Sequence, residues 1–126
     1  MIRHADLPTL RAALWTLRAA RQARRSLAVE GINGVHISPP PPLPRRAARG
    51  VGGMLRRMNA TCLIRAAVVQ AWDSAHGHPR DLVVGVTAPG EGFRAHAWLE
   101  GDPPCHSEGF AELLRRPPER RPTAAT

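Results

Sequence analysis

Cys62 and His96 are the two side chains of this sequence best suited to do covalent chemistry together. Thr61 precedes the cysteine and is a good N-cap residue, so the apolar run that follows is predicted to begin a helix at Cys62. The helix dipole and the free backbone N–H groups of a first turn favour a thiolate. His96 follows about thirty residues later in a strand-like segment. A thiol at a helix N-terminus and an imidazole from a strand are the pair used in cysteine nucleophilic catalysis.

A third, acidic group usually orients such an imidazole, and Glu100, Asp102 and Glu108 are the candidates after His96. If the His96 strand pairs with the next segment in a hairpin whose turn is centred on Asp102, position 96 lies opposite position 108. Asp102 would then be about 20 Å from His96 and Glu100 about 13 Å along its strand, at roughly 3.3 Å per residue. Glu108 is the predicted acidic member. A one-residue slip in register would turn it to the other face and leave Asp102 as the alternative.

The same residues allow structural interpretations. Cys62 on an apolar helix could be a small buried hydrophobe, and His96 a core histidine satisfied by a carboxylate. Cys62, His96, Cys105 and His106 could be combined as zinc ligands, but no C-x-x-C spacing typical of zinc is present. No metal site and no cofactor are predicted.

Composition limits the classes of protein to consider. A chain of 126 residues is enough for one domain with a modest core. The net charge of +8 comes entirely from arginine and favours acidic partners, but the absence of Tyr and the presence of only two Phe argue against a nucleic-acid surface. No apolar run is long enough to span a membrane, and residues 1–10 lack the features of a signal peptide. Reduced cysteines in a cytoplasmic protein are therefore expected.

The N-terminal part is predicted to be one long amphipathic helix over residues 7–30, followed by a proline-rich segment. Apolar residues at three- and four-residue steps are typical of a helix with one face in a core and a basic face in solvent. Gly31 is a suitable C-cap residue, and the proline run at 39–44 favours a polyproline II spacer or, alternatively, a ligand for a proline-binding module. The expected core residues are Leu7, Leu10, Leu14, Leu17 and Ala20, and the expected basic face is Arg11, Arg18, Arg21, Arg24 and Arg25.

The remainder is predicted to place a central helix, residues 61–75, across a small sheet. The fold class is α+β, with N-terminal helices and the catalytic helix packed on an antiparallel three-strand meander. Further elements are expected at 45–58 (helix), 82–87, 93–100 and 105–108 (strands), 88–92 (turn) and 109–116 (a helical turn or two). The predicted domains are residues 1–44, an Arg-rich helix and Pro-rich spacer, residues 45–116, the catalytic core, and residues 117–126, a disordered tail.

Four motifs together resemble the transglutaminase-like leader peptidases of lasso peptide biosynthesis. None of them is specific alone, but their combination and spacing are. The motifs are Cys62-Leu63-Ile64-Arg65-Ala66, Gly77-His78-Pro79, Leu82-Val83-Val84-Gly85-Val86 and Ala95-His96-Ala97-Trp98-Leu99-Glu100.

This resemblance covers residues 45–116 and implies a papain/transglutaminase-like fold and a cysteine protease. The enzyme would remove the leader from a ribosomally made precursor peptide, with a separate leader-recognition protein, before an ATP-dependent lasso cyclase closes the macrolactam. Carried over, Cys62 is the nucleophile, His96 the general base, and Glu108, twelve residues after the histidine, the acidic member. Two departures stand out: many relatives have Asp at this last position, and residues 101–106 lack the commoner Asp-Gly turn.

Two other functions remain open from the sequence. The same site could serve another acyl-transfer enzyme of the transglutaminase or amidase type, or the chain could be a non-catalytic basic binding protein. For acyl chemistry, the Cys62 backbone N–H is a natural oxyanion donor. Asn59 and, less favourably, Gln70 are the candidate side-chain donors.

Overall fold

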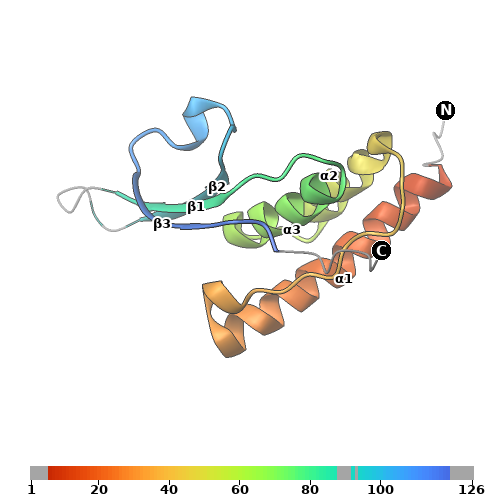
Figure 1. Ribbon diagram of the computed structural model, residues 1–126, viewed down its shortest axis with the longest axis horizontal. Coiled ribbons are helices and arrows are strands. Elements are labelled where there is room, and N and C mark those ends of the chain that lie inside the picture. The colour runs from red at the N-terminus through yellow and green to blue at the C-terminus, as the bar shows by residue number, and fades with distance from the viewer. Residues whose placement is uncertain (1–5, 88–91, 93, 120–126) are drawn as a thin grey trace, which may run out of the picture.

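The structure is a computed structural model that describes residues 6–87, 92 and 94–119 (Figure 1). It confirms the predicted α+β class, with three helices and a small antiparallel sheet of three strands. The helices are α1 (Leu7–Glu30), α2 (Ala48–Arg57) and α3 (Cys62–Ala75), and the strands are β1 (Leu82–Val86), β2 (Ala95–Leu99) and β3 (Ala111–Arg116). Three short 3-10 turns lie at Ile32–Gly34, Arg45–Ala47 and Pro104–His106.

Local sequence signals define the ends of α1 as predicted. The side chain of Asp6 accepts a hydrogen bond from the Thr9 backbone N–H at 3.0 Å and caps the N-terminus. Gly31 ends the helix at φ 77°, and its N–H donates to the Leu27 carbonyl. A left-handed C-cap of this kind favours glycine, so the predicted bounds of this helix are confirmed.

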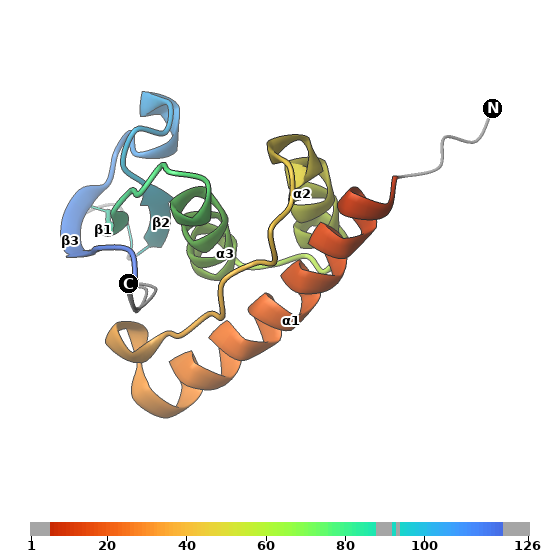
Figure 2. The same cartoon turned by 45° about the vertical axis from the view of Figure 1, so that its right-hand side comes forward.

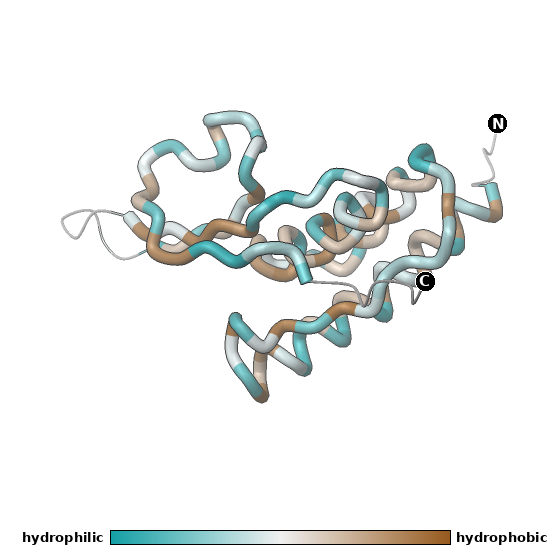
Figure 3. Tube along the Cα trace, viewed as in Figure 1, coloured by the Kyte–Doolittle hydropathy of each residue, from teal (hydrophilic) through white to brown (hydrophobic). Residues whose placement is uncertain are grey.

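The buried face of α1 is not the predicted one. Three of the four leucines expected in the core are open to solvent, with Leu7 68%, Leu10 51% and Leu14 53% exposed. Leu17 is half-buried, and Ala20 is buried as predicted. Hydrophobic and hydrophilic residues do alternate along the helix (Figure 3). The face that is buried instead consists of small residues and one tryptophan: Ala12, Trp15, Thr16, Ala19, Ala20 and Ala23.

The reason for this rotation is a close crossing of α1 and α2. A Cβ on Gly50 of α2 would lie only 2.2 Å from the Thr9 carbonyl oxygen of α1. Backbones that approach this closely require glycine and alanine at the contact, and leucine is too large for it. The helical period was therefore correct, but the assignment of the core face was wrong.

The sheet has the order β2-β1-β3, with β1 in the centre. The predicted meander is thus wrong, because β3 pairs with β1 and not with β2. The segment predicted as a strand at 105–108 begins in a 3-10 turn, and the segment predicted as helical at 109–116 contains β3. Pro103 and Pro104 have no N–H with which to pair in a hairpin, so the chain leaves β2 there and returns along the other edge of β1.

Gly85 allows β2 and β3 to approach β1 from both sides. A Cβ at this position would lie 2.6 Å from Cη2 of Trp98 and 2.9 Å from the Ala111 carbonyl oxygen. The β1–β3 register is irregular at the same point, between Val84 and Gly85. A glycine inside a strand commonly marks such a close approach.

α3 lies between the sheet and the other two helices, and contacts α1 as well as β1 and β2 (Figure 2). One hydrophobic core joins all of these elements, from Ala12 and Trp15 of α1 through Val68 of α3 to Leu82 and Leu99 of the sheet. The helix predicted within a separate N-terminal segment, residues 1–44, therefore shares its core with the rest.

Two segments are expected to be irregular, 39–44 and 117–126. The structure describes all of the first and residues 117–119 of the second. Pro40 and Leu43 are buried, and the Trp15 indole of α1 donates to the Ser38 carbonyl at 2.9 Å, so the proline run lies along the helix. Glu119 accepts a hydrogen bond from the Ile37 backbone N–H at 3.0 Å. The rest of the expected disordered tail, 120–126, and most of the expected turn at 88–92 lie outside the described residues.

Candidate active site

Cys62 is the first residue of α3, as the sequence predicts. Thr61 has extended backbone angles, and its hydroxyl accepts a hydrogen bond from the Ile64 N–H at 3.3 Å. The Cys62 thiol is free and half-buried.

His96 lies on β2 directly opposite Gly85 of β1. Alternation along β2 buries Ala97 and Leu99 in the core and leaves His96 and Trp98 half-buried on the opposite face. The imidazole centroid is 5.2 Å from the ring of Phe110 and 6.0 Å from the ring of Trp98. Aromatic rings therefore cover part of the histidine, as a residue of a sheltered site requires.

Cys62 and His96 line one cleft of about 520 Å³ at the side of β2. Neither side chain forms a hydrogen bond within the part of the chain that the structure describes; catalytic hydrogen bonds are often long before substrate binds. The remaining lining comes from the turn before α3, from α3, from β2 and from the connection that follows β2: Ala60, Arg65, Ala66, Val69, Ala97, Trp98, Leu99, Asp102 and His106.

Asp102 is the carboxylate that lines this cleft. It accepts hydrogen bonds from Nη1 of Arg80 at 2.9 Å and from the Leu99 backbone N–H at 3.0 Å, and Nδ1 of His106 lies 3.5 Å away. Burial opposes the ionisation of Asp102, but these donors outweigh it and lower the pKa of the carboxyl group. Arg80 also donates to Asp73 of α3 at 2.6 Å, so the loop after β2 is joined through Arg80 to the C-terminal half of α3, the helix that begins at Cys62.

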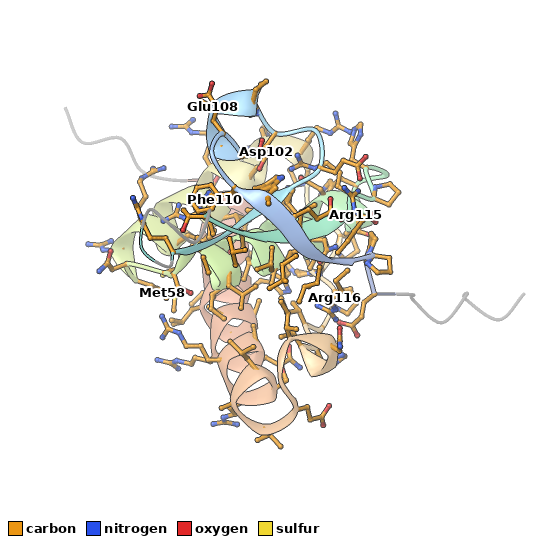
Figure 4. All side chains as sticks on the ribbon, turned by 90° about the vertical axis from the view of Figure 1, so that its left-hand side faces the viewer. Met58, Asp102, Glu108, Phe110, Arg115 and Arg116 are labelled. Atoms are coloured by element: carbon orange, nitrogen blue, oxygen red, sulfur yellow. The ribbon has the colours of Figure 1, made fainter. Side chains whose placement is uncertain are left out.

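Glu108 lies elsewhere. It is exposed near the outer tip of the connection between β2 and β3, whereas Asp102 lies nearer to the sheet (Figure 4). It does not line the cleft, and among the described residues its side chain makes no hydrogen bond or ion pair. The hairpin register that placed Glu108 opposite His96 is wrong, so only the spacing in the family resemblance still supports its predicted role.

The two candidate side-chain oxyanion donors, Gln70 and Asn59, differ in whether their amide groups are already hydrogen-bonded within the protein. The Gln70 amide is buried and donates to the Arg80 carbonyl at 2.8 Å and to the Arg116 carbonyl at 3.1 Å. Its role is to join α3 to the end of β3. Asn59 is exposed with φ 52° in the turn before α3, and it does not line the cleft. The Cys62 N–H remains the oxyanion donor that the helix itself provides.

Sequence analysis missed two further residues of the cleft, Arg65 and His106. Arg65 follows Cys62 by three residues in a helix, and this spacing alone places both on one face. His106 reaches the cleft only because the chain turns back at Pro104, which no local pattern indicates.

Within residues 6–87, 92 and 94–119, no three His, Cys, Asp or Glu side chains are grouped so that they could hold a metal ion. None of the helices among these residues is long and apolar enough to cross a bilayer.

The transglutaminase-like superfamily matches residues 5–116, which is most of the chain and includes α1. The protein belongs to this superfamily. Membership agrees with the observed α+β fold and supports cysteine peptidase or acyl-transfer chemistry. No curated protein and no solved structure matches the chain.

Proposed function

We propose that this protein is a cysteine peptidase that removes the leader peptide from a lasso precursor. The observation that carries the proposal is the placement of Cys62 and His96 in one cleft, with the cysteine at the N-terminus of α3. The resemblance of the four motifs around these residues to lasso leader peptidases supports this particular role within the transglutaminase-like superfamily.

The proposed reaction proceeds through an acyl-enzyme. The Cys62 thiolate attacks the carbonyl carbon at the leader–core junction, and the Cys62 N–H stabilises the oxyanion that forms. His96 gives a proton to the leaving amine of the core peptide as the C–N bond breaks. Water, deprotonated by His96, then hydrolyses the thioester and releases the leader.

Two carboxylates compete for the acidic role beside His96. The spacing in the family resemblance assigns it to Glu108, and this assignment is part of the proposal. The position of Asp102 in the cleft is the competing argument. Variants of each residue separate the two, because a carboxylate that supports the imidazole slows turnover when it is neutralised.

The proposal includes a cytoplasmic location and three partners: the precursor peptide, a separate leader-recognition protein and an ATP-dependent lasso cyclase that uses the product. The outer face of α1 suits protein docking, since the exposed Leu7, Leu10 and Leu14 form a continuous apolar stripe. Arg21, Arg24 and Arg25 are exposed in the following turns of α1 and extend this surface with positive charge, which favours an acidic partner. Charge reversal at Arg21, Arg24 and Arg25 is expected to weaken the complex with the leader-recognition protein, and unchanged binding would contradict this surface.

The test is leader cleavage followed by mass spectrometry, with the precursor and the recognition protein encoded beside this gene. Wild type should cut at one junction, and Cys62→Ala and His96→Ala should be inactive. If Glu108→Gln is slow and Asp102→Asn retains activity, Glu108 is the acidic member; the reverse result assigns the role to Asp102. Cleavage by Cys62→Ala at the wild-type rate would end the proposal. Capture of an added amine in place of hydrolysis would indicate acyl transfer instead.

A further inference from the structure

The cleft beside Cys62 contains one arginine that the proposed chemistry does not use. Arg65 is exposed and lines the cleft with Cys62 and His96. Cys62 and Arg65 are three residues apart in α3, so their Cβ atoms are neighbours at about 5–6 Å. The helix therefore places the Arg65 and Cys62 side chains on one face, at the same cleft.

Arg65 differs from the other charged groups around the cleft because it has no carboxylate partner. In every ion pair among the described residues, the basic partner of the carboxylate is a residue other than Arg65. Asp102, the acidic group of the cleft, is bound to Arg80, and Arg80 also binds Asp73. The charge of Asp102 on the opposite wall is thus neutralised by Arg80, whereas Arg65 on the α3 wall has no ion-pair partner among the described residues.

We infer that Arg65 forms a carboxylate-binding subsite next to Cys62. Arginine presents a planar fork of donors that matches a carboxylate, and its charge is permanent at any working pH. Resting on the proposed function, the substrate it selects is a peptide with an acidic side chain adjacent to the bond that is cut. Arg65 is in this role a specificity-determining residue, and Cys62 and His96 perform the chemistry.

A test that needs no substrate compares two alkylating reagents of similar size, anionic iodoacetate and neutral iodoacetamide. Both form a carbon–sulfur bond with the thiolate and release iodide. The rate ratio of the two reagents at Cys62 is measured by peptide mapping and divided by the same ratio at the exposed Cys105. All variants are compared at one and the same pH.

Three variants define the outcome. Arg65→Gln is expected to lower the normalised ratio roughly fivefold, and Arg65→Glu to lower it further, because the charge beside the sulfur is removed and then reversed. Arg57→Gln, an exposed arginine outside the cleft, should leave the ratio unchanged and controls for net charge. Thermal melts check that each variant is folded. An unchanged ratio in Arg65→Gln, an equal change in Arg57→Gln, or no alkylation of Cys62 overturns the subsite.

The substrate arm uses precursor variants with Asp or Asn on either side of the cleaved bond. Wild type should cut the Asp peptide with the lower KM, and Arg65→Gln should lose this preference with kcat little changed. Cleavage by wild type with no preference in any peptide overturns the inference but leaves the proposed function intact. Absence of any cleavage, together with the expected alkylation ratios, overturns the proposed function but leaves the carboxylate subsite intact.

Discussion

The two walls of the cleft are built in different ways. The helix wall is local: Thr61 caps α3, and Cys62 and Arg65 follow on one face of the same helix. The strand wall is assembled over long range: His96 depends on the pairing of β2 with β1, and Asp102 depends on Arg80 and on a chain turn beyond Leu99. Sequence patterns predicted the first wall correctly and misplaced the acidic group of the second.

The difference shows which kind of interaction controls each catalytic element. A helix end requires only hydrogen bonds between residues a few positions apart, so the place of Cys62 in the first turn of α3 depends on local sequence. The strand wall requires that three strands pair in one order and that a paired arginine holds the loop. Perturbations of the strand wall are therefore expected to cost more than perturbations of the helix cap.

Within the two walls of the cleft, the largest effect is expected from Gly85→Ala in the centre of the sheet. The new methyl group would overlap the Trp98 ring and the backbone of β3, so the free energy of unfolding should fall by up to about 3 kcal/mol. Chemical denaturation measures this loss. Gly53→Ala in α2 is the matched control, because nothing lies within 4 Å of its added Cβ. Equal stability of Gly85→Ala and wild type would show that the β1 contacts with β2 and β3 are looser than described.

Asp102→Asn is expected to cost about 2 kcal/mol, because it removes a charge from a half-buried group that binds Arg80 and the Leu99 N–H. Glu108→Gln should change stability by less than about 0.5 kcal/mol, since Glu108 is exposed and makes no side-chain contact among the described residues. Urea melts of both variants give the comparison. A larger loss for Glu108→Gln would contradict the described strand wall.

Stability should also depend on pH through Asp102. Its folded pKa is lowered, so in the acidic range the unfolded state binds more protons and stability rises with pH. The contribution is fully present above the ordinary carboxyl pKa of about 3.9 and is lost as pH falls through the lower folded pKa. Urea melts of wild type and Asp102→Asn are recorded at several acidic pH values. The free energy of unfolding should rise less steeply with pH in the variant than in wild type. Identical slopes would show that Asp102 is not held as described.

A smaller effect is expected at the helix wall. Thr61→Ala removes the N-cap of α3 and should cost about 1 kcal/mol, measured by thermal or urea unfolding. Thr61→Ser keeps the capping oxygen and serves as the control. Because the cap also holds the turn that carries Cys62, iodoacetamide should label Cys62 at a changed rate in Thr61→Ala and at the wild-type rate in Thr61→Ser.

The smallest effect is expected outside both walls, on the outer face of α1. Leu14→Ala should cost less than about 1 kcal/mol, because this leucine is 53% exposed. Leu55→Ala at a fully buried position of α2 is the comparison and should cost about 2–5 kcal/mol. A core-like loss for Leu14→Ala would restore the predicted orientation of α1 and contradict the structure.

The sequence could predict what depends on neighbouring residues. The bounds of α1, the cap of α3, the position of Cys62 and the presence of a strand at Leu82–Val86 all follow from capping residues and from the spacing or type of apolar residues. The alternation along β2 likewise placed His96 and Trp98 on one face. These features need no knowledge of the rest of the fold.

Three features needed the folded chain. The buried face of α1 depends on how closely Gly50 lets α2 approach, which favours alanine over leucine at the contact. The place of β3 depends on which edge of β1 is free, and a strand of mixed residues such as Ala111–Arg116 can pair with either neighbour. The carboxylate of the cleft depends on the turn after β2 and on Arg80, because these hold Asp102 in place.

By itself, then, the sequence determined a helix that begins at a capped cysteine, a histidine on a strand and the superfamily to which they belong. Tertiary structure alone decided which acidic group enters the cleft, which cation beside the thiol remains unpaired and which face of α1 meets solvent. The physical reason is the separation along the chain of the residues that each interaction joins. Caps and periodicity act within a few residues, whereas strand order, ion pairing and helix crossing join residues that are far apart in the chain.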